Sequence, residues 1–181
     1  MSASFKPEHE IILVDSSDKE LTQQCIDVRI KVFVDEQGFP VEAELDDYDK
    51  PGASVHFLLR LLPSLEPLGC ARLVIAKGKI GRLCILKDYR KYGFGRDLMN
   101  KCHALAADKL GTREFEVHSQ IPVIPFYAKY VVDVPASLVA YSLKTWSRFG
   151  YVPVGDPFDE DGRPHKKMVL TLPSDYGRRA T

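Results

Sequence analysis

Two glycines one residue apart, flanked by basic side chains, form the part of this chain best suited to bind an anion. They lie in the run Arg90-Lys91-Tyr92-Gly93-Phe94-Gly95-Arg96, after an apolar segment at residues 80–86 and before an amphipathic segment. Main-chain N–H groups approach an anion closely where no Cβ intervenes, and the start of a helix adds a partial positive charge. The run therefore predicts a site for a phosphate-bearing ligand that is bound mainly by main chain.

The elements that would position this run alternate between strand and helix patterns. Apolar steps of three and four residues predict a helix that starts at a capping box, Ser17 to Glu20, and ends at Gly38. A second helix should follow the loop and stop at Gly111, and a short one should lie at residues 123–129. Strands are expected at residues 10–14, 55–62, 68–76, 80–86, 114–118 and 167–172, with an antiparallel meander at 55–86. This order predicts a mixed α/β fold in a single domain, residues 1–181.

Size and composition are those of an ordinary globular protein. The chain has 181 residues, 45% of them hydrophobic, and its 25 basic side chains balance its 25 acidic ones. Balanced charge gives no sign of a general nucleic-acid or membrane-surface binder, no apolar run could span a bilayer, and the N-terminus lacks a secretory signal. Scattered cysteines in apolar contexts favour buried free thiols over disulfides or zinc, and hence a cytoplasmic or nuclear protein: Cys25, Cys70, Cys84 and Cys102.

Of two acidic segments, one suggests calcium binding, but its spacing does not support it. Residues 156–161 fail the register of a calcium loop, because Pro157 falls where the first ligand should lie. A solvated turn, or an acidic rim that attracts a cationic amine, fits this segment. The same two interpretations apply to Asp46, Asp47 and Asp49, where the solvated one is preferred. We expect no metal.

The loop and a second motif together resemble those of the GNAT superfamily of acyl-CoA N-acyltransferases. The pattern Arg90-x-x-Gly93-x-Gly95 between strand and helix is followed by Pro125-Phe126-Tyr127-x-Lys129, and the resemblance spans residues 10–172. Three further segments look like the small ElaA-like branch, whose substrates are poorly defined: residues 32–38, 46–49 and 158–165. The resemblance implies a mostly antiparallel sheet, splayed at the cofactor site and flanked by helices.

The resemblance also implies acetyl-CoA as co-substrate and the primary amine of a small molecule as acceptor. In that family the glycine loop, here residues 90–96, holds the coenzyme A pyrophosphate. The backbone of the preceding strand, here Leu83, Cys84 and Ile85, pairs with the pantetheine amides. Direct attack by the amine is preferred over an acyl-cysteine route, because no histidine adjacent in sequence could activate Cys84.

Tyr127 matches the tyrosine that donates a proton to the leaving thiolate in many family members. A phenol with a reference pKa of about 10 stays protonated at neutral pH, and a thiolate can accept from it. The alternative is that Tyr127 only packs beside Phe126. The oxyanion is expected to be stabilised by a main-chain N–H of the strand at residues 83–85.

The general base is less clearly marked. Several family members carry a glutamate on the fourth strand, and this chain has no acid there. His118, which should end the fifth strand, is the preferred base because its reference pKa of about 6.5 suits the role. Glu36 and His165 are weaker candidates, and His56 more simply fills a position in the sheet.

Residues 130–148 depart from the family pattern. Without them, Phe126-Tyr127-Ala128-Lys129 would run directly into Phe149-Gly150-Tyr151, the start of the next expected strand. An extra segment of this size is long for a connection inside a compact domain. It is either a genuine amphipathic insertion or a translated intron, and sequencing the transcript would decide. Residues 174–181 are expected to form a polar tail.

Other functions remain open. A non-catalytic coenzyme A-binding module and an acetyltransferase acting on a protein or peptide amine both fit the sequence. The expected partner is a small-molecule amine, with neither nucleic acid nor membrane, and a homodimer is an open alternative.

Overall fold

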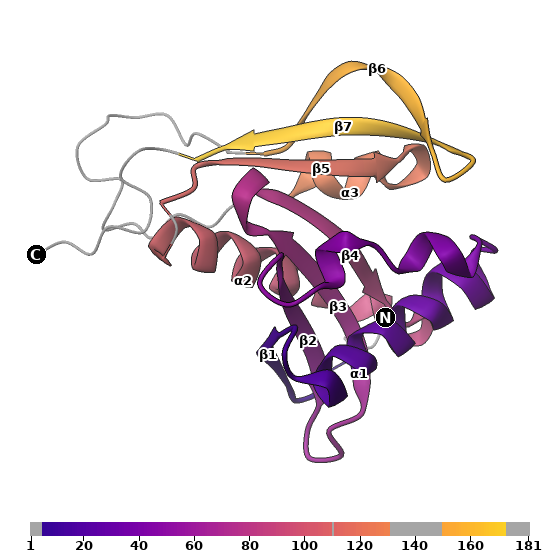
Figure 1. Cartoon of the computed structure of the whole chain (residues 1–181), viewed down its shortest axis with the longest axis vertical. Coiled ribbons are helices and arrows are strands. Elements are labelled where there is room, and N and C mark those ends of the chain that lie inside the picture. Colours follow the sequence, from indigo (N-terminus) through magenta and orange to yellow (C-terminus); the bar gives the residue numbers. More distant parts are fainter. Residues whose placement is uncertain (1–4, 110, 131–149, 173–181) are drawn as a thin grey trace, which may run out of the picture. The chain divides into compact units, whose positions relative to one another are not determined.

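The computed structural model describes residues 5–109, 111–130 and 150–172 (Figure 1). The chain divides into two compact units, of which the first comprises Met1–Ala76 and Ile80–Cys102, and the second Lys77–Lys79 and His103–Thr181. The predicted insert and the polar tail lie outside the described residues, apart from Tyr130. No helix in the described ranges is long and apolar enough to cross a membrane.

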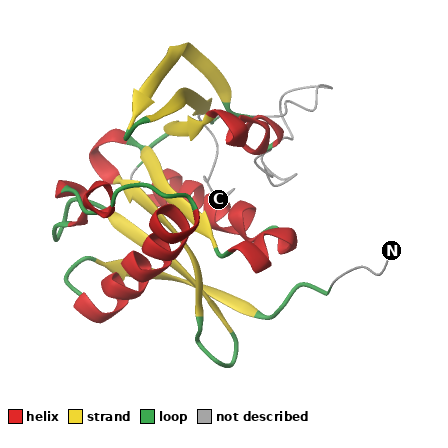
Figure 2. Ribbon diagram, turned by 90° about the vertical axis from the view of Figure 1, so that its right-hand side faces the viewer, coloured by secondary structure: helices red, strands yellow, loops and turns green. Residues whose placement is uncertain are grey.

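Seven strands in the described part of the chain form a mixed sheet in the order β1-β2-β3-β4-β5-β7-β6. The pairs β1/β2, β2/β3, β5/β7 and β6/β7 are antiparallel, whereas β4 and β5 pair in parallel through Lys79 and Glu116. Helices and strands are both prominent (Figure 2). The predicted mixed α/β class, with a mostly antiparallel sheet and flanking helices, is therefore confirmed.

The first unit contains the strands β1 (His9–Asp15), β2 (Val55–Leu61), β3 (Pro67–Val74) and most of β4 (Lys79–Ile85). Helix α1 (Lys19–Arg29) contacts β2 and β3 and continues as a π-helical segment, Ile30–Glu36. Its N-cap is Asp18, whose carboxylate accepts from the Leu21 N–H at 3.0 Å. The predicted capping box that begins at Ser17 is wrong. The Ser17 N–H donates to the Asp15 carboxylate and is therefore not available to Glu20.

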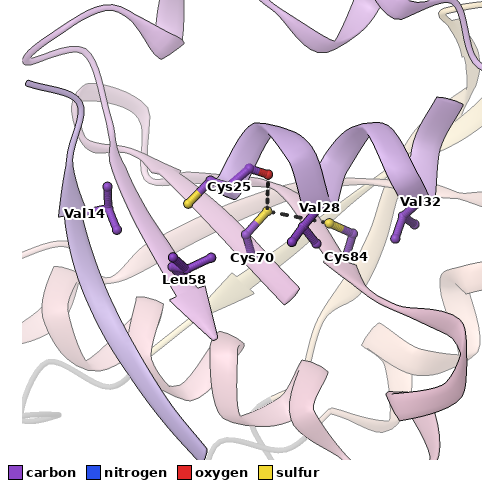
Figure 3. Close-up of a cluster of buried hydrophobic side chains, with 7 residues drawn as sticks. All are labelled: Val14, Cys25, Val28, Val32, Leu58, Cys70 and Cys84. Atoms are coloured by element: carbon purple, nitrogen blue, oxygen red, sulfur yellow. Dashed lines mark hydrogen bonds between the residues drawn. The ribbon is translucent and has the colours of Figure 1, made fainter. Parts of the chain in front are cut away.

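The core of this unit lies between α1 and the sheet (Figure 3). The residues drawn there are all buried: Val14, Cys25, Val28, Val32, Leu58, Cys70 and Cys84. The Cys70 and Cys84 sulfurs lie 3.6 Å apart, without a disulfide. Burial raises the pKa of Cys84 well above its usual value. The predicted buried free thiols are confirmed, and the Cys84 thiol keeps its proton at neutral pH.

The face of the sheet that carries this core changes from apolar to ionic two residues away along β2 and β3. Alternate residues of a strand share a face, and β2 carries His56 beside Leu58 while β3 carries Arg72 beside Cys70. The apolar pair Leu58–Cys70 and the polar pair His56–Arg72 are neighbours in the β2/β3 register. Helix α1 therefore covers an apolar half and an ionic half of one surface.

Helix α2 (Phe94–Lys109) follows β4 through a short 3₁₀ turn, Lys87–Tyr92. Its predicted buried face is confirmed by residues with no exposed surface: Leu98, Met99, Cys102 and Ala106. Gly111 adopts a positive φ of 66°, and the Thr112 N–H bonds back to the Ala106 carbonyl. This is the glycine stop that the sequence predicts.

The second unit contains β5 (Glu114–Gln120), the short helix α3 (Ile124–Lys129), β6 (Val152–Glu160) and β7 (Arg163–Thr171). Two predictions are corrected here. Strand β5 continues two residues beyond His118, and residues 156–160 belong to β6 instead of a solvated turn. The chain reverses at Asp161 and Gly162, which both have positive φ, so that β6 and β7 form a tight hairpin.

Candidate active site

Gly93 gives the cofactor loop, residues 90–96, its shape. It has φ 76° and ψ 14°, a left-handed conformation that costs glycine no Cβ clash. Its carbonyl accepts from the Arg96 N–H at 3.0 Å and from the Asp97 N–H at 3.4 Å, so it caps the first turn of α2. A Cβ built on Gly93 would meet no atom within 4 Å. The surface at Gly93 is therefore open enough for a phosphate to approach the helix start, as the predicted ligand requires.

The loop side chains divide into exposed and buried ones. Lys91 and Arg96 are exposed, and the Lys91 amine lies over the Tyr92 ring, 5.1 Å from its centroid. Phe94 is fully buried and packs against Tyr92 and His9. Phe94 can thus contribute only main chain to a ligand, while the two exposed cations add positive charge.

Arg90 is already bound within the protein. Its Nη1 and Nη2 donate to the two carboxylate oxygens of Glu36, at 2.7 and 2.6 Å, and its Nε donates to the Ile85 carbonyl at 2.9 Å. The hydrogen bonds from Arg90 lower the pKa of Glu36, which makes that carboxylate a weaker base. The structure thus brings two predicted site residues together, but as an ion pair that ties the end of the π-helical segment to the end of β4.

The strand positions predicted to pair with pantetheine lie at the end of β4. Leu83 is half-buried, while the side chains of Cys84 and Ile85 are buried. Any contact of the latter two with a ligand must therefore come from main chain. Arg90 occupies one of the two lone pairs of the Ile85 carbonyl.

His118 is the centre of a histidine cluster in the second unit, formed with Glu116, Glu160 and Lys79. Its Nε2 lies 2.9 Å from Glu116, and its Nδ1 lies 3.0 Å from both carboxylate oxygens of Glu160. The Lys79 amine is also 3.0 Å from Nδ1. The Phe158 ring packs edge-on against the imidazole, with centroids 4.8 Å apart.

These contacts allow His118 two protonation states. Glu116 and Glu160 accept from both ring nitrogens when the ring is an imidazolium. Lys79 can only donate, so its contact requires an unprotonated Nδ1. The hydrogen bond from His118 lowers the pKa of Glu160 even though burial opposes its ionisation. The cluster thus holds the imidazole between two carboxylates and one ammonium group.

Tyr127 is buried on α3, which packs against β5. Its ring lies edge-on to Phe126, at a centroid distance of 5.1 Å, and to Tyr151, at 5.5 Å. The structure confirms that Tyr127 packs beside Phe126, and this packing fixes the orientation of its ring.

A buried histidine that the sequence did not single out contacts two nearby tyrosines, Tyr130 and Tyr151. His103, on α2, has no exposed surface, and its two ring nitrogens lie 2.9 Å from the hydroxyls of Tyr130 and Tyr151. Burial lowers the pKa of His103 to about 3, so the ring is neutral and one hydroxyl donates while the other accepts. Gly150 lies close to the same place, since a Cβ built on it would be 3.1 Å from the Tyr130 carbonyl oxygen.

The other predicted residues have structural roles. His165 is buried, with its Nδ1 2.9 Å from the Arg163 carbonyl. His56 fills a fully buried sheet position, as predicted, and burial lowers its pKa to about 4. The solvated interpretation holds for Asp47, which pairs with the exposed Lys50. It is wrong for Asp46 and Asp49.

Asp46 and Asp49 belong to an ionic cluster in the first unit: Arg29, Glu44, Asp46, Asp49, Arg72 and Arg82. Arg72 holds Asp46 through two contacts of 2.7 Å, and Arg29 holds Asp49 at 2.7 and 3.2 Å. Although burial opposes ionisation of Asp49, the two guanidinium groups lower its pKa. These pairs join residues far apart in the chain, so no local pattern reveals them.

The sequence patterns did not single out Glu116 or Glu160 as site residues, although each carries a local signal. Glu116 lies two residues before His118 and therefore shares its face of β5. Glu160 precedes the Asp-Gly pair at 161–162, a strong hairpin signal that would have placed it in a strand.

Known proteins resemble this chain in sequence and in fold. The sequence model of the family described as "Acetyltransferase (GNAT) domain" matches residues 22–130. A Bacillus subtilis protein named as a candidate acetyltransferase is 30% identical over 156 residues, which cover 85% of this chain and 91% of that protein. The structure of a candidate N-acetyltransferase from Lactobacillus plantarum has a TM-score of 0.68 and 28% identity, covering 91% of this chain and 99% of its own. Escherichia coli ElaA, at 22% identity and a TM-score of 0.67, shares the fold, covering 88% of this chain and 98% of its own.

Proposed function

This chain belongs to the GNAT acetyltransferase family, and from that premise we propose that it transfers an acetyl group from acetyl-CoA to the primary amine of a small molecule. The observation that carries the proposal is the cofactor loop, in which a left-handed Gly93 with open space around its Cβ position caps the start of α2. In this proposal the loop binds the pyrophosphate of coenzyme A through main chain, assisted by Lys91 and Arg96.

Amide formation from a thioester requires a deprotonated amine, a stabilised oxyanion and a leaving thiolate that can accept a proton. We assign acceptance of the amine proton to His118, whose ring is oriented by the carboxylates of Glu116 and Glu160. We assign oxyanion stabilisation to the main chain of Leu83–Ile85 and proton donation to Tyr127. Glu36 is paired with Arg90, and we assign it to fixing the loop and not to acting as a base.

Direct attack by the amine is favoured over an acyl-cysteine intermediate. Cys84 lies on the proposed cofactor strand, but its thiol is buried against Cys70 and its pKa is raised. A nucleophilic cysteine needs thiolate character and access to the substrate. Cys84 has neither feature.

The proposal is tested by measuring acetyl-CoA binding by calorimetry and release of the coenzyme A thiol with an amine panel. The panel contains small primary amines and polyamines, together with peptides that carry a free N-terminus or a lysine. Thiol release with a small amine is the expected result. Release only with peptides would move the acceptor to a protein amine, and binding without turnover would favour the non-catalytic module. Absence of binding would overturn the cofactor-loop assignment.

A further inference from the structure

Arg82 has an unusual backbone conformation for its place in the fold. Three non-glycine residues of the described ranges have positive φ: Leu65, Arg82 and Asp161. Leu65 and Asp161 lie in turns that connect strands, whereas Arg82, with φ 50°, lies inside β4. A residue with a Cβ adopts this conformation inside a strand only where its surroundings impose it.

The side chain of Arg82 explains what imposes it. Its Nη2 donates to the Ala43 carbonyl and lies 3.4 Å from Asp46 Oδ2, and its Nε lies 3.6 Å from Glu44 Oε2. These partners all belong to residues 43–46, between α1 and β2. Arg82 therefore ties this segment to the middle of β4.

The segment is held firmly from its other side. Arg72 donates to Asp46 through both terminal guanidinium nitrogens, and the fully buried Arg29 contacts Glu44 at 3.1 Å. Arg82 thus shares each of its two carboxylates with another arginine. Because Arg29 and Arg72 are buried and fixed, the segment is a stable anchor for the Arg82 side chain.

The conformation of residue 82 also determines the direction of the main-chain groups that follow. Along a regular strand, N–H groups point alternately to the two edges, and a left-handed residue breaks this alternation. The Arg82 carbonyl lies 3.5 Å from the Cys70 sulfur and accepts from its thiol. The next residues are Leu83 to Ile85, whose main chain carries the proposed contacts to the thioester.

We propose that Arg82 is a positioning residue: the contacts of its side chain with residues 43–46 hold the β4 backbone in a left-handed turn that aims the main-chain groups of Leu83–Ile85 at the thioester. This inference rests on the proposed function. It adds that the segment after α1 controls the geometry of the cofactor strand through one arginine.

The test compares Arg82→Ala with Arg82→Gly. Both variants lose the ion pairs, but glycine adopts positive φ without steric cost and can keep the turn. We expect kcat to fall about 30- to 100-fold in Arg82→Ala and to recover to within about 5-fold of the parent in Arg82→Gly, since a misaimed donor costs rate. The Kd for coenzyme A should rise by a smaller factor than kcat falls, because the pyrophosphate site at Gly93 and α2 is unaltered and only the pantetheine pairs of Leu83–Ile85 are displaced.

Arg60 provides a matched control. It lies on β2 without a positive φ and pairs with Glu10 at 3.0 Å. Glycine at position 60 should be no better than alanine in kcat, because there is no left-handed turn to rescue. If Arg82→Gly is no more active than Arg82→Ala, Arg82 is only an ion-pair partner and the proposal is wrong.

A crystal structure of Arg82→Ala separates this proposal from the proposed function. We expect φ at residue 82 to return to negative values in that variant. A positive φ retained with alanine would overturn the proposal whatever the activity. If the parent protein turns over no thioester at all, the proposed function fails, while the φ measurement still decides whether the Arg82 side chain holds the turn.

Discussion

The cofactor loop and the histidine cluster differ in which part of the chain provides the contacts. In the loop the proposed recognition elements are a left-handed glycine and the start of a helix, so main chain within seven residues would supply them. In the cluster the contacts are between side chains of β4, β5 and β6, up to 81 residues apart between Lys79 and Glu160. The loop is thus fixed by local conformation, whereas the cluster depends on correct pairing of distant strands.

This difference predicts that substitutions in the two regions affect different steps of the reaction. A change in the cluster or at Tyr127 should lower kcat and leave coenzyme A binding intact, because His118 and Tyr127 are proposed to transfer protons. A change in the loop should weaken binding first. The following variants test this separation, beginning with the largest expected effect.

His118→Gln should lower kcat by about 10²- to 10⁴-fold, the usual range for loss of a general base. Glutamine can hydrogen-bond to Glu116 and Glu160 but cannot take up a proton at neutral pH. Steady-state kinetics with the best amine measure the effect, and calorimetry should give an unchanged Kd for coenzyme A. A kcat within about 3-fold of the parent would reduce His118 to a structural residue.

Tyr127→Phe should lower kcat by about 10- to 100-fold with acetyl-CoA, because the thiolate leaves without a proton donor. Phenylalanine keeps the ring that packs against Phe126 and Tyr151, so the fold should be preserved. With an acetyl thioester whose thiol is more acidic than that of coenzyme A, kcat should fall less, because that thiolate needs less help from a proton donor to leave. Equal losses with both thioesters would argue that the hydroxyl has another role.

His103 makes the stability of the second unit depend on pH. Its pKa of about 3 in the folded protein lies below the reference value of about 6.5 for an unfolded chain. The unfolded state therefore binds more protons below pH 6.5, and stability falls as the pH decreases from about 6.5 towards 3. From pH 7 to pH 5 this histidine should account for a loss of about 2 kcal/mol in the free energy of unfolding.

Urea unfolding of the parent and of His103→Gln at both pH values measures this contribution. The variant should be less stable at pH 7 but should lose about 2 kcal/mol less on acidification. His56, with a pKa of about 4, should add the same pH dependence to the stability of both proteins and therefore cancel in the comparison. An unchanged difference between the two pH values would mean that His103 is protonated in the folded state.

Gly93→Asp and Gly93→Asn form a matched pair for the loop. Both residues tolerate positive φ better than other side chains and have nearly the same size, so their difference isolates charge. The aspartate should weaken coenzyme A binding by about 10-fold relative to the asparagine, from repulsion of the pyrophosphate. Calorimetry at low and high salt measures it, and equal affinities for the two variants would contradict the phosphate assignment.

Glu36→Gln should have the smallest effect, with kcat changed less than about 3-fold, because an exposed ion pair contributes little and a lowered pKa makes Glu36 a poor base. Amine-dependent turnover across pH 6 to 9 is the appropriate measurement, since loss of a base would alter the profile. A loss of 100-fold or more would return Glu36 to the role of catalytic base.

The contrast between the two regions also explains how far the sequence could be interpreted. The loop, the buried face of α2 and the stop at Gly111 depend on neighbours within a few turns, and all three were predictable. The cap of α1 was misplaced by one residue because Ser17 and Asp18 are both good caps. The ionic cluster could not be foreseen, since Arg29 meets Asp49 only after α1 has docked on the sheet.

The meeting of Tyr130 and Gly150 has a consequence for how the chain can vary in length. The two residues are far apart in sequence but adjacent in space, and His103 fixes Tyr130 and Tyr151 on either side. Closely spaced, well-anchored ends make a position where length can change without moving the elements on either side. The chain can therefore be re-engineered at this junction. Either a short linker or a reporter domain between Tyr130 and Gly150 could replace the residues that now connect them.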